Sequence, residues 1–137
     1  MNESRYPRNP ENQELSIDAL KQQLCESILD PLFTNQCEVI MLQRGSEMEK
    51  LVFDGGLNMT EKGKQLFQQA YSETLASIMS RNKNAFSLKS LMTNAQALDL
   101  LDELIKSNLK GIIQHEIDLN HAGLDSLMKG FIQKNSA

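Results

Sequence analysis

This 137-residue chain contains two histidines with acidic neighbours, and residues of these types can do chemistry. His115 and His121 flank Glu116 and Asp118 in the stretch HEIDLNH, and imidazole and carboxylate groups both ligate transition metals. Zinc catalysis needs three protein ligands in fixed geometry, whereas histidines six residues apart fall on different sides of a continuous helix. We therefore expect no metal or other cofactor. The histidines are interpreted as solvated or packed, with a weak metal site as the alternative.

The segment 118–129, DLNHAGLDSLMK, begins like a calcium-binding loop. Asp118, Asn120 and Gly123 match positions 1, 3 and 6 of the EF-hand pattern, which also needs an oxygen ligand at position 5 and a bidentate Glu at position 12. This chain supplies an alanine and Lys129 at those two positions. A lysine ammonium repels the cation, so no calcium site is expected. Asp118 or Asn120 is predicted to cap a helix instead, with Gly123 in the turn.

The same segment contains GLDSLM (123–128), with Ser126 in an Asp-Ser-Leu triplet. These six residues resemble the signature of carrier proteins, and the resemblance implies a phosphopantetheine arm on Ser126. A carrier protein needs that serine at the start of a helix with two more helices behind it, but eleven residues follow Ser126 here. A short motif without its context carries little weight. Ser126 is therefore predicted to be an ordinary surface serine, and no motif identifies a family.

No other residues form a credible catalytic set, so the protein is predicted not to be an enzyme. The stretch 54–56, Asp-Gly-Gly, lacks the lysine and further glycines of a nucleotide-binding loop. Cys25 and Cys37 have no second cysteine pair or histidine-rich tract beside them and are predicted to be buried free thiols. A small enzyme would need one pocket that gathers these thiols or the two histidines.

Composition places the chain among ordinary globular proteins, with 40% apolar and 23% charged residues. Its net charge of −4 gives no bulk attraction to nucleic acid or anionic lipid. Residues 59–92 differ, because they hold five bases and two acids. The leading alternative function is therefore a DNA-associated transcriptional regulator that uses this basic segment and is sensitive to reversal of Lys83 and Lys89. Nucleic acid is otherwise an unexpected partner.

The ends of the chain bear on its location and domain organisation. Residues 1–13 are polar, contain two prolines, and lack the apolar core of a signal peptide, so they are predicted to form a flexible arm. No apolar run approaches the roughly 20 residues that span a bilayer. We expect a cytoplasmic protein that does not contact membranes, with residues 14–137 as a single globular domain.

The first half of that domain is predicted to be mixed. Apolar residues at helical spacing indicate a helix over 14–30, which the pair Asp30-Pro31 is expected to stop. The short runs CEVIML (37–42) and MEKLVF (48–53) are rich in Val, Ile and Phe, and Gly45 lies between them. This pattern predicts a β-hairpin with Gly45 in its turn.

The second half is predicted to be helical. Asn58 and Glu61 resemble a capping box for a helix that residues 81–84 break. A turn at 87–92 then leads to a long helix over 94–117, capped by Thr93 or Asn94, and a last helix over 123–134. The fold class is therefore α+β and helix-dominated: an N-terminal helix, a β-hairpin, then three to four amphipathic helices.

These features favour a small acidic, non-enzymatic protein-interaction module, such as an adaptor, a secretion-chaperone-like protein or a toxin-neutralising protein. Its partner would be another protein or a second copy in a homodimer. Binding would use the hairpin edge, the C-terminal amphipathic helix, or both. Alternatively, the apolar face of that helix closes the core. The predicted partner-binding residues are Val39 and Met41 in the hairpin, and Leu124, Met128, Phe131 and Ile132 in the last helix.

Overall fold

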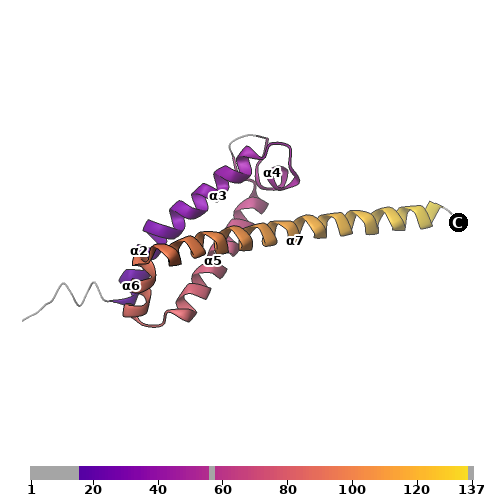
Figure 1. Ribbon diagram of the computed structural model, residues 1–137. Helices are drawn as coiled ribbons and strands as arrows, with labels where there is room; N and C mark the ends of the chain where they lie inside the picture. Colours follow the sequence, from indigo (N-terminus) through magenta and orange to yellow (C-terminus); the bar gives the residue numbers. More distant parts are fainter. Residues whose placement is uncertain (1–15, 56–57, 136–137) are drawn as a thin grey trace, which may run out of the picture.

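The protein is built from helices throughout residues 16–55 and 58–135, the parts that this computed structural model describes. In chain order the elements are α2 (Ile17–Leu24), a π-helical turn η1 (Cys25–Leu29), α3 (Asp30–Leu42), α4 (Glu47–Val52), α5 (Glu61–Arg81), α6 (Ala85–Thr93) and α7 (Ala95–Asn135). Helices α3, α5 and α7 form the body, and α7 extends far beyond it (Figure 1). The predicted α+β class is wrong, because the fold is all-helical.

The first helix does not stop at Pro31, contrary to the sequence prediction. Helices α2 and α3 follow one another through η1, in which the Asp30 N–H bonds to the Cys25 carbonyl five residues back. Pro31 occupies the first turn of α3. A proline ring normally clashes with the preceding helical turn and removes a hydrogen bond. The wider π turn opens the hydrogen-bond ladder at this point, so the chain continues as a helix.

The predicted β-hairpin is absent, and both of its strands are helical. Residues 37–42 belong to α3, and most of 48–53 form α4. Short apolar runs do not distinguish a strand from a buried helix segment by periodicity alone. The buried positions of α3 are Phe33, Gln36 and Ile40, which follow the helical spacing of three and four. Across the described residues, β pairing is limited to one isolated bridge.

The turn between α3 and α4 owes its shape to the residues that suggested a hairpin. Gly45 has a φ of +84°, a left-handed conformation that favours glycine. Ser46 then caps α4, because its hydroxyl accepts a hydrogen bond from the Glu49 N–H at 3.1 Å. The Glu49 carboxylate reaches back to the Gly45 N–H at 3.2 Å. This Ser-x-x-Glu arrangement is a helix start rather than a strand turn.

Helix α5 begins at a tight junction with α4, two residues later than predicted. Thr60, not Asn58, is the cap: its hydroxyl accepts from the Gly63 N–H at 2.9 Å and donates to the Leu51 carbonyl at 2.7 Å. A Cβ on Gly63 would lie 2.6 Å from the Val52 carbonyl oxygen. Glycine at this position therefore lets the two backbones approach.

In the later part of the chain, one predicted break and one predicted cap are present, and the other predicted boundaries are wrong. The break at 81–84 is confirmed, but 85–93 forms α6 where a turn was predicted, capped by Asn84 through the Ser87 N–H at 2.8 Å. Of the two predicted caps of α7, Thr93 and Asn94, Asn94 is the one that caps it. The predicted break before 123 is absent, because α7 runs without interruption to Asn135.

One hydrophobic core unites the described helices, and α7 contributes its longest row. Helix α5 packs most extensively against α7. The buried residues of α7 are Leu101, Ile105, Leu109, Ile113 and Ile117. A repeat of four residues advances by roughly 40° per step, so this row winds slowly around α7 as it follows the neighbouring helices. The predicted arm, 1–13, lies outside the described residues.

Candidate functional site: the projecting half of α7

Helix α7 leaves the body of the protein after Ile117. Every residue from 118 to 132 is exposed, whereas Ile113 and Ile117 are buried. Figure 1 shows this part of α7 projecting from the other helices as the orange-to-yellow end of the chain. We call residues 118–135 the tail. At 1.5 Å per residue, the tail is about 27 Å long.

The tail carries a row of exposed apolar side chains, which we call the tail stripe. Its members and their exposed fractions are Leu124 (59%), Leu127 (71%), Met128 (52%), Phe131 (65%) and Ile132 (58%). Spacings of three, four and seven place these residues on one side of a helix. Because Leu124 follows Ile117 by seven residues, the stripe continues the core-facing side of α7. Leu119, which is 53% exposed, lies about 140° away around the helix.

This arrangement gathers four of the six residues predicted to bind a partner. Single exposed apolar side chains are normal, but a contiguous patch is typical of an interaction surface. Val39 and Met41 lie elsewhere, on α3, and the strand edge expected to present them does not exist. Val39 lines a groove between α3 and α7, and Met41 packs against the core.

A pocket lies at the base of the tail, between α4 and α7. It has a volume of about 240 Å³ and is lined by Glu47, Lys50, Leu51, Ile117, Asn120 and His121. We call it the root pocket. The His121 Nε2 atom lies 2.5 Å from the Glu47 carboxylate and ties the first turn of the tail to α4. The root pocket therefore offers Leu51 and Ile117 as apolar wall, with polar groups around them.

The residues of this segment that suggested a metal, calcium or carrier-protein site lie along one continuous helix. His115 is exposed and stands on a different side of the continuous helix from His121. Asp118 lies inside α7, where it accepts a hydrogen bond from Gln114 at 3.0 Å, so it caps nothing. Ser126 lies mid-helix rather than at a helix start. No group of three or more metal-ligating residues was found in the described ranges.

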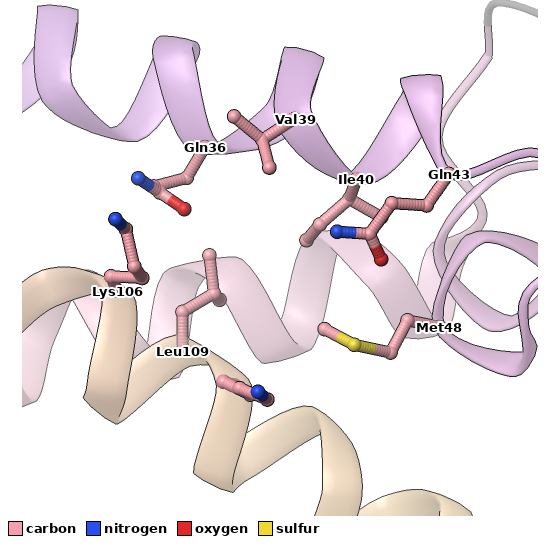
Figure 2. Close-up of a pocket in the computed structure, with 8 residues that line it drawn as sticks. Gln36, Val39, Ile40, Gln43, Met48, Lys106 and Leu109 are labelled. Carbon is pink, nitrogen blue, oxygen red and sulfur yellow. The ribbon is translucent and has the colours of Figure 1, made fainter.

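A second pocket, of about 180 Å³, lies between α3 and α7. Its floor is apolar, with Ile40 and Leu109 buried. Figure 2 shows the amide of Gln36 and the ammonium of Lys106 extending toward one another across it. Lys106 also lies 3.5 Å from Glu103. These groups could hold a small anion, but they include no nucleophile and no base.

The π turn places a thiol, a phenol and a carboxylate together. The Tyr71 hydroxyl donates to the Asp30 carboxylate at 2.7 Å, and its ring packs against Phe33 with centroids 5.1 Å apart. Burial, followed by hydrogen bonds with Cys25 and Asp30, raises the pKa of Tyr71 well above its ordinary value. A nucleophilic cysteine needs a nearby cation to favour its thiolate, and these neighbours supply a carboxylate and a phenol instead. The arrangement favours packing of α5 on the π turn.

The second cysteine is also a poor nucleophile. Cys37 lies in α3 rather than in a strand, and both cysteines are free and half-buried. Burial, and then the neighbouring Glu38 carboxylate, raises the pKa of the Cys37 thiol. A raised pKa keeps the thiol protonated at neutral pH and therefore unreactive.

The basic segment 59–92 is divided by the fold. Lys62 pairs with Glu116 at 3.6 Å, and Lys64 pairs with Glu61 at 3.4 Å. The remaining bases lie near the far end of α5 and in α6, and seventeen helical residues span about 26 Å. The five bases therefore do not form one continuous patch, which reduces the support for a DNA-binding surface.

Comparisons with protein-family models, with curated proteins and with solved structures found no match to this chain. Within the described stretches, no helix combines the length and the apolar character needed to cross a membrane.

Proposed function

We propose that this protein is a non-enzymatic interaction module that binds a protein partner through the tail stripe. One observation carries the proposal: five apolar side chains, each at least half exposed, share one face of a helix that has left the core. Water contact with such a surface is unfavourable, and a partner that covers it gains free energy. The hairpin edge has no place in this proposal, because those residues are helical.

The recognition mode that fits this surface is an amphipathic helix laid against an apolar groove or another helix. Anchors at positions i, i+3, i+4 and i+7 are typical of that mode. Leu124, Leu127, Met128 and Phe131 have this spacing. The tail holds two acidic and two basic residues, so apolar contact rather than bulk charge would select the partner. An adaptor, a secretion chaperone or a toxin-neutralising protein could each use this mode.

The size of the stripe limits how tightly it can bind. Fully burying a large apolar side chain is worth about 1.5–3 kcal/mol, and half to two-thirds of that applies to side chains already partly covered. Five such residues contribute about 4–10 kcal/mol, against an association cost of about 4–15 kcal/mol. A stable complex therefore also needs contacts at the edges of the stripe.

The experiment compares two Leu→Asp variants on the same tail. L124D changes the stripe, and L119D makes the same chemical change at similar exposure on another side of the helix. We expect both variants to keep the helical content and melting temperature of the wild-type monomer, because neither side chain is in the core. Protein association, measured by sedimentation or with a purified partner identified from the host, should be lost in L124D and retained in L119D.

Two results would overturn the proposal. Unfolding of the monomer by L124D, but not by L119D, would show that the stripe is part of the core. Equal association by wild type and L124D would show that partners bind elsewhere.

A further inference from the structure

We infer that the tail stripe is covered by the tail stripe of a second copy, with the two tails antiparallel; this inference rests on the proposed function. An isologous contact needs a surface that is complementary to itself under a twofold rotation. The tail offers three features that satisfy this condition: a straight apolar row, a pocket at its base, and one acid and one base placed to exchange partners.

The register follows from the positions of the row and the pocket. We place Leu124 of one copy on Met128 of the other. Because the two helices run in opposite directions, the residue numbers of any two facing positions then add up to 252. Phe131 then faces His121 of the second copy, at the mouth of its root pocket. That pocket, of about 240 Å³, has Leu51 and Ile117 in its wall and can receive a large apolar side chain. Each tail thus places its distal aromatic at the base of the other.

The charges on the tail favour antiparallel over parallel pairing. Asp125 and Lys129 are exposed and form no ion pair within the described residues. In the antiparallel register, Asp125 of each copy lies within reach of Lys129 of the other, so two opposite-charge contacts form by symmetry. In a parallel pair each flank of one helix faces the opposite flank of the other, so Asp125 and Lys129, which share one flank, would lie on opposite sides of the contact and would not pair. Opposite-charge contacts that form in only one orientation favour that orientation of a helix pair.

The area available indicates a reversible dimer. Ten stripe residues, five from each copy, bury on the order of 1,000 Å² in total if each loses roughly 100 Å². Stable complexes usually bury about 1,200–2,000 Å², and smaller interfaces belong to transient encounters. We therefore expect exchange between a monomer of 15.5 kDa and a dimer of twice that mass, with a Kd on the order of micromolar.

Charge reversal tests the pairing directly. Sedimentation velocity over roughly 1–300 µM full-length protein would measure the Kd of wild type, D125K, K129D and the double variant D125K/K129D. Each single variant creates two like-charge contacts and should weaken the dimer about tenfold. The double variant restores opposite charges and should return to within about threefold of wild type. A different protein partner would not be rescued in this way.

Cysteine cross-linking tests the orientation. A chain carrying L124C is mixed with a chain carrying M128C and oxidised, with the unaltered chain as control for the native thiols. Antiparallel tails bring position 124 of one copy beside 128 of the other, within the 4.4–6.8 Å Cα separation that a disulfide requires. The mixed disulfide between the two chains should therefore dominate. A predominance of 124–124 disulfides would establish parallel tails and overturn the proposed register.

The outcomes separate this inference from the proposed function. A chain that stays monomeric up to roughly 300 µM overturns self-pairing. If the stripe of that monomer still binds a purified partner and L124D abolishes the binding, the interaction module stands with a different occupant. If neither self-association nor partner binding depends on Leu124, both proposals fail.

Discussion

The clearest contrast in this protein is between two leucines of the same helix, and a Leu→Ala change at each tests the division of α7 into core and tail. Leu109 is 1% exposed and lies in the buried row, whereas Leu124 is 59% exposed on the tail. The two substitutions remove the same atoms and introduce the same strong helix former. Any difference in their effect on stability therefore reports the surroundings of the side chain rather than helix propensity.

The magnitude for L109A follows from its burial. Replacing a fully buried leucine by alanine costs about 2–5 kcal/mol, from lost transfer free energy and from the cavity that remains. Leu109 also lines the pocket between α3 and α7, so part of the new space is continuous with an existing hollow. We expect a loss of about 3 kcal/mol in the free energy of unfolding. In a chain of this size the melting temperature would fall by about 10 °C.

For L124A the expected loss is within about 0.5 kcal/mol when the protein is monomeric, as for other surface substitutions. At higher concentration a dimer adds stability by linkage, and L124A should lose that part alone. Urea unfolding followed by circular dichroism, at protein concentrations well below and well above the Kd, measures both terms. The slope of the unfolding curve should not change, because neither variant alters the folded surface greatly.

A loss above about 1.5 kcal/mol for L124A in the monomer would place Leu124 in the core and refute the division of α7. A loss of less than about 1 kcal/mol in the free energy of unfolding for L109A would also refute the division of α7, because truncating a buried leucine costs more than that.

Two further predictions concern the bundle. G63A should destabilise the protein by about 1–3 kcal/mol, because the new Cβ would lie 2.6 Å from the Val52 carbonyl oxygen. G111A should stabilise it by about 0.5–1 kcal/mol, because no atom lies within 4 Å of its Cβ. Thermal melts measure both changes, and a G63A melting temperature at or above that of wild type would show that the α4–α5 junction is loose. Y71F should cost about 1 kcal/mol at neutral pH through the lost bond to Asp30. The raised pKa keeps Tyr71 protonated in the folded state, whereas tyrosine in the unfolded chain ionises near pH 10. The free energy of unfolding of the wild type should therefore fall as the pH rises above about 10. Urea unfolding at about pH 8 and about pH 11 should show this fall in the wild type and not in Y71F.

The helix caps were only partly predicted from the sequence, because Asn58 and Asp118 were also expected to be caps and are not. Asn94 was predicted as a cap and is one, because a short polar side chain can replace the missing carbonyl partner of a first turn. The Ser-x-x-Glu pair at Ser46 and Glu49 carried the same signal and would have replaced the hairpin by two helices. The β-branched residues around Gly45 hid that signal, because short apolar runs fit either period.

The continuity of the helices was not readable from local propensity. Pro31 is a strong stop signal, yet the π turn before it absorbs the conflict, and such a turn depends on packing rather than on a residue pattern. Gly123 is a weaker signal, costing about 1 kcal/mol in a helix interior. With no proline between residues 95 and 135, that cost does not end α7. The apolar period of the last segment was predicted correctly, but whether it faces the core or solvent was fixed by where the other helices end.

The tail has a low intrinsic helix stability. It contains Gly123 and Gly130, each unfavourable in a helix by about 1 kcal/mol, and an isolated helix of its length is marginal in water. Its order therefore comes from the buried half of α7, which removes the nucleation cost, and from the contact between His121 and Glu47. Binding and helix stability are consequently linked: a partner that covers the stripe should slow amide exchange from 118 onward, while exchange in the buried half of α7 stays unchanged. If the tail binds as proposed, α7 is half core and half interface, and it connects the stable fold to the bound partner without a hinge.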